Sequence, residues 1–183
     1  LQRMVDYGAG ACMDAFGYHP YGFAYPPERD PDLVSNGFTF RGIEVMHDIL
    51  AARGLGEMPL WATEFNWLRR PADDGNENCD NDPTYQTYFK WQEVSAATQA
   101  DYLVRAFQYA DTHWPWLEGL FVWNLDWHDY MTWEPCFHSR YYALRRMDGT
   151  YLGADTPAYL ALAAMEKRPG PVAGALLHRR QGQ

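Results

Sequence analysis

The stretch that governs the expected fold is Pro59-Leu60-Trp61-Ala62-Thr63-Glu64-Phe65-Asn66-Trp67. It opens with a short apolar run and ends in a carboxylate between aromatic residues. A run of this length, bounded by Pro and Gly, is typical of a buried strand. A carboxylate at the end of a buried strand is costly unless it is paired, hydrogen-bonded or used in catalysis. Glu64 is therefore either an acid that faces solvent or a catalytic acid at the mouth of a barrel.

The rest of the chain repeats this pattern of a strand followed by a long connection. Further strands are expected at residues 13–18 and 119–124. Helices are expected over residues 1–7, 40–53, 95–112 and 156–167, with Ser95 and Thr156 as N-caps. Connections into the strands are short, whereas those that leave them are long, and residues 68–94 form the longest polar loop. This pattern predicts an α/β fold with three parallel βα units.

Polar and aromatic side chains follow each of the three expected strands. His19 and Tyr21 follow the first strand, Glu64 and Trp67 the second, and residues 123–127 the third. The C-terminal ends of parallel strands meet at one edge of a sheet, where the outgoing loops build the functional site. We therefore expect these residues to lie close together, although tryptophans there also suit a core.

Composition limits the classes of function. The 183 residues suffice for one domain with a sizeable core, and 16% are aromatic, which suits stacking on flat or sugar-like ligands. The net charge of −9 argues against a nucleic-acid surface, and no apolar run approaches membrane-spanning length. The cysteines Cys12, Cys79 and Cys136 lie far apart, and their odd number predicts no disulfide framework and leaves the compartment open.

Two segments have narrower interpretations. Residues 76–82 alternate oxygen ligands, as in a calcium site, but the glycine and the closing Glu of an EF-hand loop are missing, so we favour a solvated acidic loop. Residues 168–183 contain Pro and Gly and then basic residues, and we expect a disordered tail there. Because the chain begins at Leu1 rather than Met, we expect it to be a piece of a longer protein.

Four short motifs follow one another along the chain. They lie at residues 14–21, 62–65 and 119–124, and in a closing segment at residues 142–144, 148–150 and 157–159. In this order they resemble strands six, seven and eight and the closing segment of the barrels of clan A glycoside hydrolases, near families 5 and 39. The resemblance implies that residues 1–167 are a partial catalytic domain. This domain would be the C-terminal portion of a TIM (β/α)8 barrel, about strands 6–8 with helices 5–8.

The resemblance also implies roles for individual residues in a retaining O-glycoside hydrolase that acts on oligo- or polysaccharides without a cofactor or metal. Glu64 takes the position of the nucleophile, and Trp123 that of the sugar-stacking residue of strand eight. His19 and Tyr21 take positions from which strand-six groups reach the nucleophile or sugar hydroxyls. The other expected substrate-binding residues are Trp67, Asp126, Trp127 and Trp133.

The acid/base of the clan has no counterpart here. In the clan it is a Glu after an Asn at a strand end, whereas Asn76-Glu77 lies inside the polar loop, so we expect the acid/base on an upstream segment and no activity from this piece alone. Two alternatives stay open: a non-catalytic carbohydrate-binding protein and an α/β interaction fold with its tryptophans in the core. Glu64 in a cleft would favour the glycosidase. The sugar, the linkage and the oligomeric state stay open, and secretion is favoured because many sugar polymers lie outside the cell.

Overall fold

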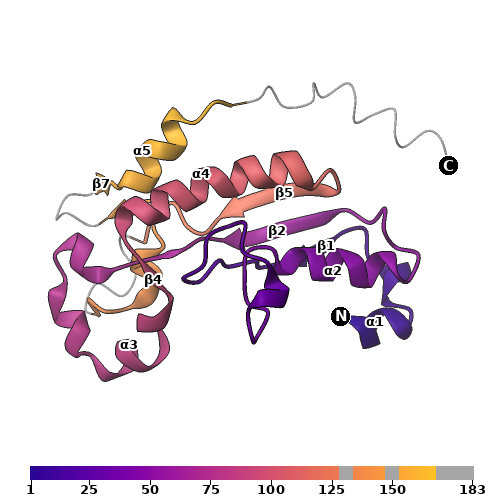
Figure 1. Cartoon of the computed structure of the whole chain (residues 1–183), viewed down its shortest axis with the longest axis horizontal. Helices are drawn as coiled ribbons and strands as arrows, with labels where there is room; N and C mark the ends of the chain where they lie inside the picture. The colour runs from indigo at the N-terminus through magenta and orange to yellow at the C-terminus, as the bar shows by residue number, and fades with distance from the viewer. Residues whose placement is uncertain (128–133, 147–152, 168–183) are drawn as a thin grey trace.

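The computed structural model describes residues 1–127, 134–146 and 153–167. A parallel three-stranded sheet in the order β1-β2-β5 lies at its centre (Figure 1). The strands are β1 (Phe16–Tyr18), β2 (Leu60–Phe65) and β5 (Leu117–Val122). The predicted parallel α/β arrangement is therefore confirmed, while the strands of the described residues form an open sheet and not a closed barrel.

Two helices cover one face of this sheet. They are α2 (Gly42–Ala51) and α4 (Ala96–His113), which run beside the strands in Figure 1. The side chains of Leu60 and Ala62 on β2 are fully buried and belong to one core cluster with Ile43 of α2 and Leu103 of α4. Apolar residues at helical spacing thus meet alternate residues of the strand, as the periodicity of the sequence predicts.

The helix starts follow the expected capping signals. The Ser95 side chain accepts a hydrogen bond from the backbone N–H of Thr98, and Thr156 does the same for Tyr159 at the start of α5 (Pro157–Ala164). α5 packs on α4 and ends before the expected residue 167, because the backbone of Met165 is extended. At the other end, α1 (Gln2–Asp6) is the short helix expected before Gly8.

The other face of the sheet is open to solvent in the described structure. Trp61 of β2 is 41% exposed and Phe121 of β5 is 50% exposed, and their rings lie 6.0 Å apart. Both residues alternate with residues that point into the core. Among the described strands, β1 and β5 each have only one neighbour in this sheet. An α/β sheet of this kind buries both faces when it is complete.

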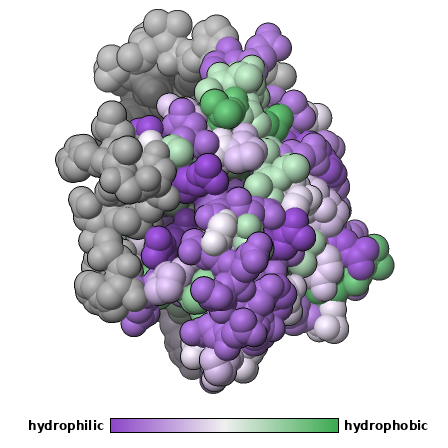
Figure 2. All heavy atoms as spheres, turned by 90° about the vertical axis from the view of Figure 1, so that its left-hand side faces the viewer, coloured by the Kyte–Doolittle hydropathy of each residue, from purple (hydrophilic) through white to green (hydrophobic). Residues whose placement is uncertain are grey.

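Residues 68–94 are not the irregular polar loop that the sequence predicts. They contain α3 (Pro83–Tyr88) and the paired strands β3 (Leu68–Arg69) and β4 (Glu93–Val94), with 3-10 helices η3 (Pro71–Asp74), η4 (Glu77–Asn81) and η5 (Lys90–Gln92). Asp82 caps α3 by accepting from the N–H of Tyr85 at 2.7 Å. Elements this short carry no periodic signal, and tertiary contacts stabilise them. Figure 2, seen from the side toward which β2 and β5 run, shows mostly hydrophilic residues.

The remaining elements are short. They are η1 (Ala9–Cys12), η2 (Pro31–Leu33), η6 (His138–Tyr141) and the antiparallel pair β6 (Arg145–Arg146) and β7 (Ala154–Asp155). No helix of the described residues is long and apolar enough to cross a membrane. The expected tail at residues 168–183 and part of the closing motif, residues 148–150, lie outside the described residues.

The structure corrects the prediction for the cysteines. Cys79 of η4 and Cys136 form a disulfide, with Cα atoms 5.2 Å apart, while Cys12 is free and exposed. Their separation of 57 residues hid this pairing in the sequence. The loops that follow β2 and β5 meet at the same end of the sheet, and this long-range contact brings the two thiols together.

Candidate functional site

Glu64 lies at the C-terminal end of β2, where the pairing of β2 with β5 is irregular. The register shifts between Ala62 and Phe65, so the strand does not place Glu64 in simple alternation. The side chain is 29% exposed. Its Oε2 accepts one hydrogen bond, and no hydrogen bond to Oε1 is found among the described residues. Glu64 is therefore a partly exposed strand-end carboxylate and not a member of a buried salt bridge.

Tyr21 holds this carboxylate. Its hydroxyl donates to Glu64 Oε2 at 2.9 Å. Burial of the ring, and then the hydrogen bond and negative charge of Glu64, raise the pKa of Tyr21 far above its ordinary value of 10. The hydroxyl therefore stays protonated and remains a donor at neutral pH. Edge-to-face packing on Tyr142, with ring centroids 5.3 Å apart, orients the Tyr21 ring.

His19 approaches the same carboxylate oxygen from the end of β1. Its Nδ1 lies 3.4 Å from Glu64 Oε2, and the side chain is 53% exposed. The turn after β1 brings His19 and Tyr21 together, since the N–H of Tyr21 donates to the carbonyl of His19. The structure thus joins three residues that the sequence places after two different strands.

An open hollow of about 330 Å³ surrounds Glu64. Its lining consists of Tyr21, Phe23, Glu64, Phe89, Gln92, Trp123, His138, Ser139 and Tyr142. Ligand sites in proteins typically have volumes of about 300–1,000 Å³, with mostly apolar walls and a few converging polar groups. Five of these lining residues are aromatic rings of Phe, Tyr or Trp, so the hollow has this character.

Trp123 reaches the hollow from the end of β5. Its backbone N–H donates to the carbonyl of Phe65, and its backbone carbonyl accepts from the Asn66 side chain. These two hydrogen bonds fix Trp123 beside the end of β2. Trp127 packs edge-to-face on Trp123, with ring centroids 5.6 Å apart, and does not line the hollow. Asp126 is exposed, forms a β-bridge with Arg145 and does not line the hollow.

The prediction that Trp67 contacts sugar is wrong, because the structure places its side chain in the core. Trp67 is fully buried, and its Nε1 donates to the carbonyl of Tyr25 at 2.7 Å. Its ring packs with Phe40, Phe65 and Tyr102 in the aromatic core. The strand-end position suggested exposure, but the chain turns back over this ring: a Cβ at Gly22 would lie about 2 Å from it. Trp133 lies outside the described residues.

Several residues of the lining are not predicted from the sequence, above all His138. Its ring stacks on Phe89 with centroids 4.0 Å apart, and burial lowers the pKa of His138 below its ordinary value of 6.5. The imidazole is therefore neutral at pH 7 and offers one donor and one acceptor. Gln92 accepts a hydrogen bond from the hydroxyl of Tyr142. The position of His138 in the loop after an aromatic strand end was the available signal.

A buried polar network fixes the floor behind the hollow. Asn66 is fully buried and donates to the carbonyls of Trp123 and Tyr142 at 2.6 and 2.7 Å. Gln99 of α4, also fully buried, donates to the carbonyls of Trp67 and Tyr141. The network therefore ties β2, the end of β5 and the η6 segment to one helix.

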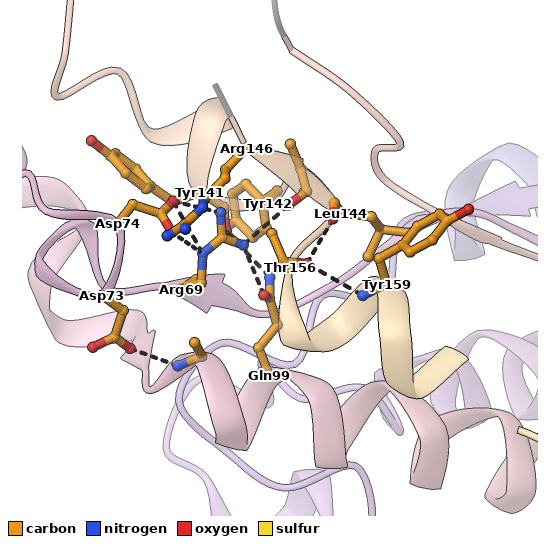
Figure 3. A network of polar contacts seen from close by, with 12 residues as sticks. Arg69, Asp73, Asp74, Gln99, Tyr141, Tyr142, Leu144, Arg146, Thr156 and Tyr159 are labelled. Carbon is orange, nitrogen blue, oxygen red and sulfur yellow. Dashed lines mark hydrogen bonds and ion pairs between the residues drawn. The ribbon is translucent and has the colours of Figure 1, made fainter. Parts of the chain in front are cut away.

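Arg69 completes this network (Figure 3). The side chain has no exposed area, and it forms a two-pronged ion pair with Asp74, whose side chain is 10% exposed. It also donates to Gln99 Oε1 at 2.9 Å and to the carbonyl of Ala143 at 3.1 Å. A buried guanidinium is tolerated because its donors are satisfied. The arrangement holds the loop after β2 against residues 141–143.

The acidic loop uses its carboxylates within the protein. Asp80 pairs with the ammonium of Lys90 at 2.5 Å, and Asp82 caps α3. Among the described residues, no group of three or more His, Cys, Asp or Glu side chains is placed to hold a metal ion. Within the described lining of the hollow, Glu64 is the one carboxylate.

Comparison with known proteins gives one informative likeness. No family model matches the chain, and no curated protein matches it. A solved structure with a similar fold is a family 39 glycoside hydrolase from the gut symbiont Bacteroides cellulosilyticus WH2, with a TM-score of 0.54 and 18% sequence identity. The match covers 89% of this chain and 29% of that one. This chain thus shares its fold with a part of that glycoside hydrolase.

Proposed function

We propose that this chain is part of the catalytic domain of a retaining O-glycoside hydrolase, with Glu64 as the nucleophile. The proposal is carried by the position of Glu64, a strand-end carboxylate in an aromatic hollow that accepts a hydrogen bond from Tyr21. The fold that the chain shares with part of a family 39 enzyme supports it. The disulfide between Cys79 and Cys136 fits an oxidising compartment and supports secretion.

The proposed reaction has two steps. The Glu64 carboxylate attacks the anomeric carbon and forms a glycosyl ester, while a second carboxyl group protonates the departing oxygen. That second group then removes a proton from water, which attacks the anomeric carbon and releases Glu64. Tyr21 and His19 hold Glu64 Oε2, which leaves Oε1 for the attack.

Sugar contacts follow from the same geometry. Trp123 offers an aromatic face in the hollow, and His19, Tyr21 and the neutral His138 offer polar atoms to sugar hydroxyls. Asp126 and Trp127, which lie outside the hollow, are proposed to contact sugars further along the substrate.

The reaction needs a second carboxyl group about 5–5.5 Å from the first. Because Glu64 is the one carboxylate in the described lining of the hollow, we propose that another part of the protein supplies the acid/base. Further βα units would complete the barrel and pair with the edges of β1 and β5, and one of them would carry the expected Asn-Glu strand end.

The same observation keeps a second candidate function open, a carbohydrate-binding protein without catalysis. One carboxylate and several aromatic rings are sufficient to bind a sugar but not to hydrolyse it by this mechanism. The two functions differ in whether Glu64 becomes covalently bound.

The test is to treat the native protein with a 2-fluoro glycoside that carries a dinitrophenyl leaving group, followed by peptide mapping. The fluorine slows the second step, so we expect the sugar to stay on Glu64. The Glu64→Gln variant, which keeps the shape but removes the attacking charge, serves as the control and should stay unlabelled. Label on another carboxylate, or a product of inverted configuration, would contradict the assignment. Binding without any label would favour the carbohydrate-binding protein.

A further inference from the structure

Three aromatic rings from two separate loops form a column at the rim of the hollow. Phe23 lies between Phe38 and Trp91, with ring centroids 5.6 and 5.3 Å away and ring planes within 20° and 13° of parallel. Phe38 is 53% exposed and Trp91 is 50% exposed. Each outer ring is about half exposed although it stacks on Phe23, so each keeps ring surface for another partner.

The column is not part of either buried core. None of the three residues belongs to the two clusters of buried apolar side chains or to the residues packed against them. Phe23 also has a φ of 54°, a left-handed conformation that is unfavourable for a bulky residue. The backbone is thus locally strained at the residue whose ring stacks on two half-exposed rings.

The column continues the wall of the hollow. Phe23 lines the hollow together with Glu64, and Gln92, the residue after Trp91, lines it as well. A ligand that occupies the hollow and extends beyond it toward these residues meets the column next. The column therefore lies where the second part of an elongated ligand would pass.

The chemistry of the column favours an uncharged ligand with a flat apolar face. Lys90, the cationic residue that precedes Trp91 in the sequence, is already paired with Asp80 and Glu93 at 2.5 and 3.0 Å. The chain carries a net charge of −9, which disfavours a polyanion such as single-stranded nucleic acid. Neutral pyranose rings with equatorial substituents present an apolar C–H face that stacks on aromatic rings.

We propose that Phe23, Phe38 and Trp91 form an aromatic platform that binds a pyranose ring of the same glycan chain, outside the sugar unit held at Glu64. The platform rests on the proposed function in one respect, because that function places a sugar in the hollow. It adds a substrate class: a glycan of several equatorially linked units, bound along its length and not only at one end.

The test uses the full-length protein with the Glu64→Gln substitution, so that no substrate is consumed. This Glu64→Gln protein is the parent into which the other substitutions are introduced. Binding of cellohexaose and of xylohexaose, two soluble β-1,4-linked glycans, is measured by calorimetry. We expect Trp91→Ala and Phe38→Leu each to weaken binding of at least one of them by about tenfold, through the lost stacking face. Phe38→Leu keeps apolar volume, so it separates loss of stacking from loss of folding. Trp91→Phe keeps a ring and should retain most of the affinity.

Tyr7 provides the matched control. It is 86% exposed and follows α1, which lies at the opposite end of the molecule from α3 in Figure 1. Tyr7→Ala should leave hexaose binding unchanged. A methylumbelliferyl monoglycoside, which fills only the hollow, should be hydrolysed at the same rate by the Tyr7→Ala protein with Glu64 intact.

The outcomes separate the platform from the nucleophile. Two outcomes would overturn the platform even if Glu64 is labelled. In one, Trp91→Ala and Phe38→Leu bind the hexaoses as tightly as the parent does. In the other, the parent does not bind them at all. Weaker hexaose binding in these variants would support it even if Glu64 is not labelled, in which case only the hydrolase function fails. Binding of a single-stranded oligonucleotide that depends on Trp91, without hexaose binding, would overturn the sugar assignment.

Discussion

At Glu64, one hydrogen bond determines which carboxylate oxygen is held and which is available. Oε2 accepts from Tyr21 and lies near His19, whereas Oε1 makes no hydrogen bond with the described residues. A carboxylate that rotates freely would present either oxygen in many orientations. The hydrogen bond therefore pre-orients the group that is proposed to attack.

Tyr21→Phe tests this positioning role. The ring and its packing stay, but the donor to Glu64 is lost, and hydrogen bonds to charged groups contribute about 1.5–3 kcal/mol. If the protein is the proposed hydrolase, we expect its turnover to fall by about ten- to a hundredfold with little change in KM, because the loss falls on the reacting group. Steady-state kinetics with an aryl glycoside measure it. A change in KM without a change in turnover would contradict the positioning role and leave Tyr21 only its proposed contacts with sugar hydroxyls.

At the scale of elements, the loop after β2 is held by a buried ion pair. Arg69→Met removes the cation, so the Gln99 carbonyl oxygen loses this donor and Asp74 is left with the more distant Arg146, at 3.9 Å. Removing one member of a buried pair costs about 3–5 kcal/mol, so we expect the free energy of unfolding to fall by that amount. Urea unfolding measures it.

Arg70 supplies the control for this change. It is the next residue, and it pairs with Asp73 at 3.1 Å with its own side chain 48% exposed. Exposed pairs contribute about 0–1 kcal/mol, so Arg70→Met should have a small effect. Equal losses in the two variants would show that the Arg69 network is not what holds the loop.

The disulfide connects the segments after β2 and β5. It closes a loop of 57 residues, for which chain entropy predicts a stabilisation of about 4 kcal/mol. We expect the Cys79→Ser, Cys136→Ser double variant to lose most of this stabilisation, as measured by urea unfolding. Cys12→Ser, at the exposed free cysteine, should change nothing. Wild-type stability that stays the same after reduction would contradict this expectation.

At the scale of the whole molecule, the open face of the sheet exposes apolar side chains that favour self-association. Trp61 and Phe121 are 41% and 50% exposed on a face that a complete α/β sheet buries. The 183-residue chain expressed alone should therefore self-associate or bind the dye ANS. Trp61→Thr with Phe121→Thr should reduce dye binding, whereas Leu33→Thr, at an exposed leucine of η2 outside the sheet, should not. A monomer with a sharp cooperative melt and no dye binding would contradict the prediction.

Buried tyrosines give the molecule a predicted alkaline limit. Burial raises the pKa of Tyr141 to about 12, and it raises the pKa values of Tyr21, Tyr85 and Tyr142 above the ordinary value of 10. An unfolded chain releases these protons above pH 10 while the folded chain keeps them. Stability is therefore fully present below pH 10 and falls above it by about 1.4 kcal/mol per pH unit for each such tyrosine.

Phenolate absorbance and urea unfolding, followed together between pH 9 and about pH 12, test this limit. We expect phenolate formation by the buried tyrosines to coincide with unfolding. Tyr141→Phe removes one of these groups and should make the loss of stability less steep. Titration of all tyrosines near pH 10 in the folded protein would contradict the prediction.

Local sequence patterns predict the positions of some residues in this protein and not of others. Helix α4 and its Ser95 cap were predictable because capping and 3.6-residue periodicity act over a few positions. Glu64 and Tyr21 were expected to meet because parallel strands end at one edge of the sheet. The burial of Trp67 was not predictable, since its ring is covered by residues 22–25, more than forty positions away.

The sequence by itself determined the order of strands and helices, the parallel sheet and the strand ends at which polar groups gather. Those features depend on local patterns and on the geometry that all parallel sheets share. The tertiary structure alone decided that Cys79 meets Cys136, that Arg69 is buried with Asp74 and Gln99, and that His138 and the Phe23 column border the hollow. Most of these contacts join segments that are far apart in the chain, and they form only when the loops after β2 and β5 pack against each other and against the loop after β1.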